Sequence, residues 1–265
     1  MVHKVQGIYN HMKDCLENKQ SFSICRMGNA EVSTIHTGIL SPMRSITQGI
    51  PESSTLELLE LLKHSANTCD YVSSMGTWLT EDYFEKNIKK DSIYRQWKEI
   101  HQEFGITNIN YCNPDIGYLM FMEGEYNLWN LIKDKRIGII TSKLELWNKM
   151  DVDLLIRVPE MTTRPEYQKG MTEPLYGWHW EEYESIKRTI GSLVKDIDIF
   201  LIGAGYLAKG YSAYIKELGG ISLDVGKVMD TWNGEGLNRM TNWIEESADF
   251  AFNLTEAGKQ YEGKF

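Results

Sequence analysis

Apolar and polar residues alternate along this chain in two distinct patterns. Short, nearly continuous apolar runs at 136–140, 153–158 and 198–203 are typical of strands buried on both faces of a sheet. Residues 5–18 and 51–66 instead carry apolar side chains at helical spacing, and the second range begins with a proline and nearby serines that favour a helix start. The pattern therefore predicts buried strands separated by amphipathic helices.

The same patterns extend over most of the chain. Further strands are expected at 21–26, 69–74, 108–112 and 220–225. Further helices are expected at 116–133, 180–194, 206–218 and near 237–246. Strands that alternate with helices predict a Rossmann-like α/β fold, with a mostly parallel sheet and helices on both faces. Residues 1–265 are expected to form a single domain, in which 80–105 is a candidate helical insertion or lid and 159–180 a long loop.

The charge balance and the cysteines narrow the class of protein. A net charge of −9 argues against a duplex nucleic-acid binder, which needs a basic surface for the phosphates. The four cysteines are widely spaced and form no Cys-x-x-Cys pair, which favours reduced thiols over a zinc site or a disulfide scaffold. No apolar run approaches the length of a membrane span, so a soluble, cytoplasmic protein is expected.

An apolar strand runs into a glycine-rich turn, Gly203-Ala-Gly205, and a predicted helix follows. Such a turn can present backbone N–H groups and a helix N-terminus to an anionic ligand. Asp224 ends the next predicted strand, where a carboxylate can accept hydrogen bonds from a ribose. A dinucleotide site is an alternative, although Gly210 comes two positions late for a Gly-x-Gly-x-x-Gly motif. The glycines can also serve packing alone.

A second polar segment follows the first predicted strand of the sheet, Arg26-Met-Gly-Asn-Ala-Glu31. Arg26 can pair with phosphate oxygens. On a turn, the side-chain oxygens of Asn29 and Glu31 are spaced to meet one hard cation together. By spacing alone, the simpler interpretation is a surface turn whose asparagine caps a helix.

These two segments resemble a known family. Arg26-Met-Gly-Asn-Ala-Glu31 resembles the Arg-x-Gly-Asp-Gly-Glu signature of bacterial GT-D-type glycosyltransferases, with Asn29 where the family has aspartate. Ile202-Gly-Ala-Gly-Tyr-Leu-Ala-Lys209, followed by Gly220-Ile-Ser-Leu-Asp-Val-Gly226, is similar to that family's glycine-rich turn, Ala-Lys helix and Asp-x-Gly strand end. The segments occur in the expected order, and the resemblance extends loosely from about residue 20 to about residue 235.

The resemblance implies a transferase that moves a hexose from a nucleoside diphosphate sugar, such as a UDP-sugar, to a glycan, glycoprotein or lipid-linked acceptor. It implies Glu31 and Asp230 as catalytic residues, and Glu31 with Asn29 as ligands of Mn²⁺ or Mg²⁺, a site that the asparagine would weaken. Arg26 or Lys209 is expected to neutralise the diphosphate. The residues expected to bind the nucleotide sugar are Arg26, Gly28, Asn29, Gly203, Gly205, Lys209, Asp224 and Gly226.

Two other functions fit parts of the sequence. A NAD-dependent oxidoreductase could use the glycine turn, and a noncatalytic sugar-nucleotide-binding protein would account for Asn29.

His179 lies between two tryptophans and is expected in an aromatic core rather than in an acceptor cleft. Trp78 and Trp232 are expected to pack, and Arg164 to be either a solvated loop residue or a phosphate ligand. The sequence leaves open whether the chain forms a homo-oligomer.

Overall fold

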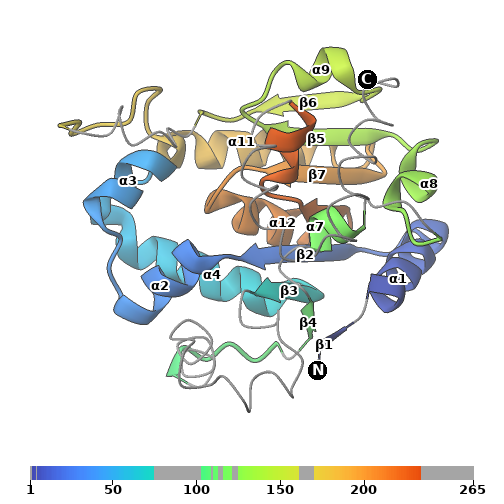
Figure 1. Ribbon diagram of the computed structural model, residues 1–265, viewed down its shortest axis with the longest axis horizontal. Coiled ribbons are helices and arrows are strands. Elements are labelled where there is room, and N and C mark those ends of the chain that lie inside the picture. Colours follow the sequence, from blue (N-terminus) through green and yellow to red (C-terminus); the bar gives the residue numbers. More distant parts are fainter. Residues whose placement is uncertain are drawn as a thin grey trace, which may run out of the picture.

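The computed structural model describes residues 2–3, 5–74, 103–108, 110–112, 116–120, 125–160 and 170–233. These residues form an eight-stranded sheet with the order β1-β4-β3-β2-β8-β7-β5-β6, and every strand pair in it is parallel (Figure 1). The strands are β1 (Val2–His3), β2 (Phe22–Met27), β3 (Tyr71–Ser74), β4 (Tyr111–Cys112), β5 (Ile137–Thr141), β6 (Leu154–Arg157), β7 (Ile199–Gly203) and β8 (Ile221–Asp224). The predicted α/β fold with a parallel sheet is confirmed.

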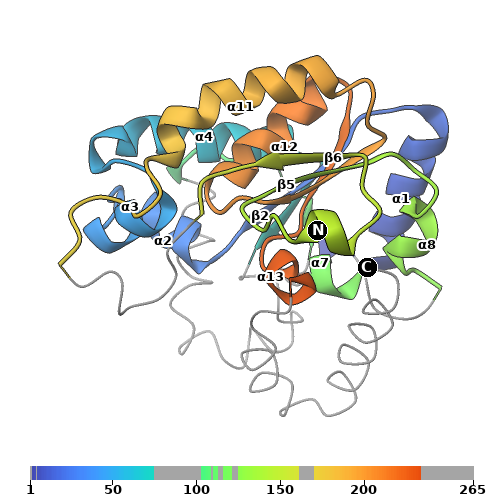
Figure 2. The ribbon, with the colours of Figure 1, turned by 90° about the horizontal axis from the view of Figure 1, so that it is seen from above.

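Helices cover both faces of this sheet (Figure 2). One hydrophobic core holds side chains of α2 (Asn29–Thr37), α4 (Thr55–Thr68), α11 (His179–Leu193) and α12 (Leu207–Glu217). The other holds side chains of α1 (Val5–Asn18), α7 (Ile116–Leu119), α8 (Leu128–Ile132), α9 (Leu146–Lys149) and α13 (Val228–Trp232). A helix α3 (Pro42–Gln48) and a 3₁₀ turn at Glu52–Ser54 connect α2 to α4.

The central strands are buried because each of their faces is covered by one of the two cores. In β7, Phe200 and Ile202 belong to the core beneath α11 and α12, whereas Ile199 and Leu201 belong to the opposite core. This alternation is the two-residue period of a strand, and full burial on both sides explains why the run is apolar without interruption. The apolar runs were therefore a sound guide to the strands.

The predicted elements are mostly confirmed, with shifts of a few residues at their ends. The expected single helix at 116–133 is wrong: the described parts form α7 and α8, and the side chain of Asn127 caps α8 by accepting a bond from the backbone N–H of Trp129 at 2.8 Å. Helices α2, α3, α9 and α13 and strand β1 were not predicted. The expected helix near 237–246, Trp78, Arg164 and most of the 80–105 insertion lie outside the described residues.

The chain leaves adjacent strands β2 and β8 towards opposite faces of the sheet. After β2 it enters α2, which packs into one core, and after β8 it enters α13, which packs into the other. In open parallel sheets, ligands bind in the crevice at the carboxyl ends of strands where the connections diverge in this way. The fold therefore predicts a ligand site at the ends of β2 and β8.

None of the helices that the structure describes is both long and apolar enough to cross a lipid bilayer.

His179 begins α11 and is buried in the core between α11 and α12, as the sequence predicted. Its Nε2 lies 3.0 Å from the hydroxyl of Tyr211, while its Nδ1 has no hydrogen-bond partner among the described residues. Burial lowers the pKa of His179 to about 4, because the imidazolium would lose its hydration. The folded protein therefore holds this side chain neutral in mildly acidic solution.

We expect His179 to make unfolding sensitive to mild acid. The unfolded chain takes up a proton at this histidine near pH 6.5, whereas the native chain does so only near pH 4. Protonation therefore favours the unfolded chain, and the free energy of unfolding falls as the pH is lowered through that range. At about 1.4 kcal/mol per pKa unit, the loss is about 3 kcal/mol. His179→Gln should remove this part of the pH dependence in urea unfolding curves. His64→Gln, at an exposed histidine, is the control, and equal pH profiles for wild type and His179→Gln would refute the assignment.

Candidate active site

The carboxyl ends of β2 and β8 are held together by a buried carboxylate. Asp224, the last residue of β8, accepts a hydrogen bond at Oδ2 from the backbone N–H of Arg26 at 3.1 Å. The side chain of Asp224 is 1% exposed. Ile24 and Leu223 pair just before this point, so the register of the two strands delivers both residues to the same edge of the sheet.

Lys209 joins this edge from the first turn of α12. Its Nζ lies 2.7 Å from Oε1 of Glu31 and 3.1 Å from Oδ2 of Asp224, and it donates a hydrogen bond to the carbonyl oxygen of Gly205 at 2.8 Å. The lysine side chain is 4% exposed and that of Glu31 is 9% exposed. Arg26, Glu31, Lys209 and Asp224 thus form a group of two cations and two anions, called here the four-charge cluster.

Glu31 reaches the cluster because α2 begins immediately after β2. Gly28 is the N-cap of α2, and a Cβ built at this glycine would lie 3.0 Å from Oε2 of Glu31. Asn29 is the first residue of the helix and is exposed, whereas Glu31 is buried. Residues two apart on a helix do not share a face. Asn29 and Glu31 therefore do not converge on one cation in this arrangement, contrary to the expectation from a turn.

The glycines of the site bring loops close together. Gly205 and Gly226 have φ of 57° and 54°, in the left-handed region that favours glycine. A Cβ at Gly203 would lie 2.5 Å from Cγ of Met229, so this glycine lets α13 pack on the end of β7. A Cβ at Gly226 would lie 3.3 Å from Nη1 of Arg26. The glycine turn at 203–205 thus forms a wall of the site, and its visible role is close packing and the carbonyl that binds Lys209.

The charges of the cluster determine one another's ionisation. Burial alone would raise the pKa of Glu31, but the adjacent Lys209 and the charge of Arg26 outweigh it and lower that pKa. Burial would lower the pKa of Lys209, and Asp224 and Glu31 reverse this and raise it. For Asp224, burial dominates over Lys209 and Arg26, and its pKa is raised. Glu31 is therefore an ionised partner of Lys209, which makes it a weak proton acceptor near neutral pH.

One oxygen of Asp224 has no hydrogen-bond partner within the described ranges. Its Oδ2 receives both Lys209 and the backbone of Arg26, whereas its Oδ1 is buried and unpaired among the described residues. A Cβ built at Gly226 would lie 3.8 Å from this Oδ1 and 3.3 Å from Nη1 of Arg26, so the glycine lets the backbone pass close to both groups. Buried carboxylate oxygens without partners are costly in a folded protein and often mark functional positions.

Asp230, the other predicted catalytic residue, lies on α13 in a second charged group. Its Oδ1 is 3.9 Å from Nζ of Lys143, which also lies 3.6 Å from Oε1 of Glu160. The side chain of Asp230 is 39% exposed. Lys143 follows β5 and Glu160 follows β6, so this group occupies the same edge of the sheet as the four-charge cluster. Of the three carboxylates predicted as site residues, Asp230 is more exposed than either Glu31 or Asp224.

Two groups of polar residues at this edge were not predicted from the sequence as site residues. Lys143 could have been found because it follows a confidently predicted strand at its carboxyl end. The hydroxyl of Tyr206, in the glycine turn, lies 2.9 Å from Oγ1 of Thr34 and accepts a bond from Arg44 on α3 at 3.4 Å. The signal for α3 was a proline at its start and Gly49 in the left-handed region after its end.

Comparison with known proteins agrees with the fold described above. A family model for the GT-D fold-like domain matches residues 3–232. The chain belongs to the GT-D fold-like family. The resemblance inferred from the Arg26 and Gly203 segments is therefore confirmed at the level of the family. No curated protein sequence matches this chain.

Solved structures share the fold of this chain at low sequence identity. A glycosyltransferase containing domain of unknown function 1792 (DUF1792) from Streptococcus sanguinis is 16% identical, with a TM-score of 0.54 over 86% of this chain and 82% of that one. A second structure, of DUF1792 described as having a distinct glycosyltransferase fold, is 14% identical, with a TM-score of 0.51 over 86% and 79%. At these identities the likeness establishes the shared fold.

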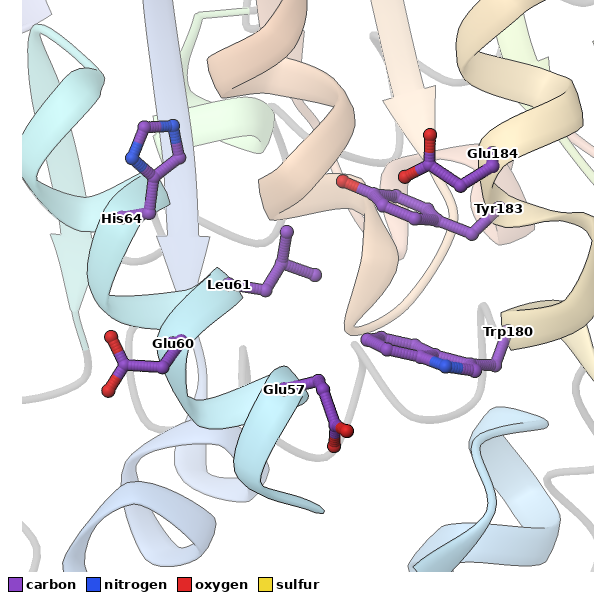
Figure 3. A pocket seen from close by; sticks show the side chains of 7 residues that line it. All are labelled: Glu57, Glu60, Leu61, His64, Trp180, Tyr183 and Glu184. Atoms are coloured by element: carbon purple, nitrogen blue, oxygen red, sulfur yellow. The ribbon is translucent and has the colours of Figure 1, made fainter. Parts of the chain in front are cut away.

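The GT-D domain of this chain also has a surface cavity of about 370 Å³ on one of its helical faces, between α4 and α11 (Figure 3). Its walls combine aromatic and acidic side chains: Glu57, Glu60, Leu61, His64, Trp180, Tyr183 and Glu184. Trp180 stacks on Tyr183 with ring centroids 5.9 Å apart. None of these residues was predicted as a site residue, and the four-charge cluster contributes no side chain to this cavity.

We expect Lys209 to stabilise the GT-D domain strongly. Lys209→Met would leave Glu31 and Asp224 as buried carboxylates without their shared cation, at a cost of about 3–5 kcal/mol in the free energy of unfolding. The double variant with Glu31→Gln should recover part of that loss, because it removes one uncompensated charge. Urea unfolding monitored by circular dichroism measures both effects.

The matched control is Lys216→Met on the same helix. Lys216 also pairs with an aspartate, Asp70, at 2.7 Å, but its side chain is 22% exposed. Solvent screening should limit its loss to about 1 kcal/mol. Equal losses for the two lysine variants, or a double variant no more stable than Lys209→Met, would contradict the role given to the buried cluster.

Proposed function

We propose that this chain is a glycosyltransferase that uses a nucleoside diphosphate sugar, with a UDP-sugar as the first candidate. The observation that carries the proposal is the four-charge cluster, which lies at the diverging ends of β2 and β8 in a GT-D fold. Both the Streptococcus sanguinis protein of this fold and the family match support this reaction class. The cluster supplies cations for a leaving diphosphate and oxygen acceptors for a sugar.

Arg26 is the cation best placed for the donor diphosphate. It is half-buried, whereas Lys209 is buried and engaged by two carboxylates. Its guanidinium lies near Gly226 and Gly28, where side chains are absent. A planar guanidinium can bind two phosphate oxygens at once, and the N-terminus of α2 beside it adds backbone N–H groups that favour an anion. Together these groups would stabilise the negative charge that develops on the leaving group.

The carboxylates divide the remaining roles. Glu31 positions Lys209, and its lowered pKa fits this task better than that of a general base. The unpaired Oδ1 of Asp224 is a ready acceptor for a hydroxyl of the ribose or the sugar. Asp230, which is partly exposed at the same edge, is the candidate to accept a proton from the acceptor hydroxyl. These roles revise the assignment of Glu31 as the principal catalytic acid.

The divalent cation implied by the family resemblance does not fit the donors as they are arranged. A hard cation needs several converging oxygen ligands, but Asn29 is exposed and Oε1 of Glu31 is occupied by Lys209. Within the described ranges, no group of three or more His, Cys, Asp and Glu side chains is arranged to hold a metal. We therefore derive no step of the reaction through a metal ion.

The acceptor and the setting remain those inferred from the sequence. A glycan, a glycoprotein or a lipid-linked sugar is the proposed acceptor class, and a bacterial, cytoplasmic protein is the proposed context. A homo-oligomer is compatible with this function. The 39% exposure of Asp230 is consistent with an acceptor that approaches from solvent towards α13.

The function is tested by incubating the protein with UDP-sugars and measuring the release of UDP. Arg26→Ala should lower kcat/KM by about 10²–10³, since it removes a group that stabilises developing charge. Asp230→Asn should lower kcat by about 10² or more if it accepts the proton. Arg136→Ala is the matched control, because this arginine pairs with Asp198 at the opposite, amino-terminal end of the strands.

Other outcomes would favour the alternative functions. Tight binding of NADH without binding of UDP would replace the transferase with an oxidoreductase. If the wild type binds UDP-sugar as tightly as Asp230→Asn does, and neither turns it over with any acceptor, the chain is a noncatalytic binding protein. Calorimetric titration of each nucleotide provides the binding measurements.

A further inference from the structure

We infer that Lys209 is the built-in counter-cation of the Glu31–Asp224 carboxylate pair, that it holds the place a divalent metal would take, and that donor binding is therefore independent of metal. The part that concerns the donor rests on the proposed function. The part that concerns metal binding rests on the arrangement of Lys209 alone, so the two can be tested separately.

All three N–H groups of the Lys209 ammonium have an acceptor. They face Oε1 of Glu31 at 2.7 Å, the carbonyl oxygen of Gly205 at 2.8 Å and Oδ2 of Asp224 at 3.1 Å. An ammonium has three donors and no more, so its hydrogen-bonding capacity is filled. These acceptors come from α2, the turn after β7 and the end of β8, three separate parts of the fold.

The same three oxygens are the kind of ligands that Mg²⁺ or Mn²⁺ prefers, two carboxylates and a carbonyl. A metal ion at this point would have to displace Lys209, whose side chain is 4% exposed. The ammonium of Lys209 can make these three hydrogen bonds only from its present position. A metal ion that took this position would therefore break all three. The ammonium and a divalent metal are thus mutually exclusive occupants.

The charge balance leads to the same conclusion. With both carboxylates ionised, as their pairing with the Lys209 ammonium favours, Arg26 and Lys209 carry two positive charges and Glu31 and Asp224 two negative ones, so the four-charge cluster is neutral. A divalent ion in place of the Lys209 ammonium would leave the cluster with a net charge of about +1 in a buried region, which is unfavourable. Asn29 contributes no negative charge that could offset it. The neutral cluster is therefore complete without a metal.

The first test measures metal binding directly. Free Mn²⁺ gives an electron paramagnetic resonance signal that is lost on binding, so titration with MnCl₂ reports the affinity of each variant. Lys209→Met should acquire a site that binds Mn²⁺ at least about tenfold more tightly than wild type, because the two carboxylates lose the ammonium that they share. Lys216→Met, which frees the more exposed Asp70, should resemble wild type. Equal affinities for wild type and Lys209→Met would overturn the inference.

The second test uses the wild-type protein and does not depend on the folding of a variant. UDP is titrated by calorimetry with Mn²⁺ present and again with excess EDTA. We expect dissociation constants that agree within about twofold, whereas a loss of about tenfold or more in EDTA would overturn metal independence. Absence of UDP binding under both conditions would count against the proposed function, and the Mn²⁺ titration would still decide the role of Lys209.

Discussion

The burial of Lys209 between two carboxylates is the interaction on which the site depends. It connects α12 to α2 through Glu31, to β8 through Asp224, and to the turn after β7 through the carbonyl of Gly205. Asp224 also receives the backbone N–H of Arg26, which brings in β2. Buried charges are tolerated only when they are paired and hydrogen-bonded. The relative positions of these five parts of the fold are therefore fixed by electrostatics as well as by the apolar cores.

The topology explains why the charges meet at this place. Strands β2 and β8 are neighbours, yet the helices that follow them pack on opposite faces of the sheet, which is the arrangement at whose carboxyl ends open parallel sheets bind ligands. Glycine at 203 and 226 allows the loops at this edge to approach closely, the first against Met229 and the second against Arg26. Polar groups can gather there because the apolar cores end where the strands end. The chemistry and the fold thus share one boundary.

The arrangement also changes how each charge contributes to function. The sequence singled out Glu31 as the working acid and Asn29 as its companion, whereas in the fold Glu31 faces Lys209 and Asn29 faces solvent. A carboxylate whose pKa is lowered by a neighbouring ammonium anchors that ammonium better than it accepts protons. In the proposed function, the half-buried Arg26 and Oδ1 of Asp224, which has no hydrogen-bond partner in the described part of the chain, contact the ligand. Under this proposal, the work first assigned to Glu31 alone is divided among several paired charges.

The sequence by itself determined the buried strands, the long amphipathic helices and the family, because apolar periodicity and short motifs are local properties of the chain. It missed α2 and α3, whose apolar pattern is short and weak, and it treated 116–133 as one helix because periodicity does not reveal a cap such as Asn127. It named Glu31, Lys209 and Asp224 as separate candidates. Only the tertiary structure decided that they bind one another, since ion pairing between distant segments depends on strand order and burial, which no local spacing encodes.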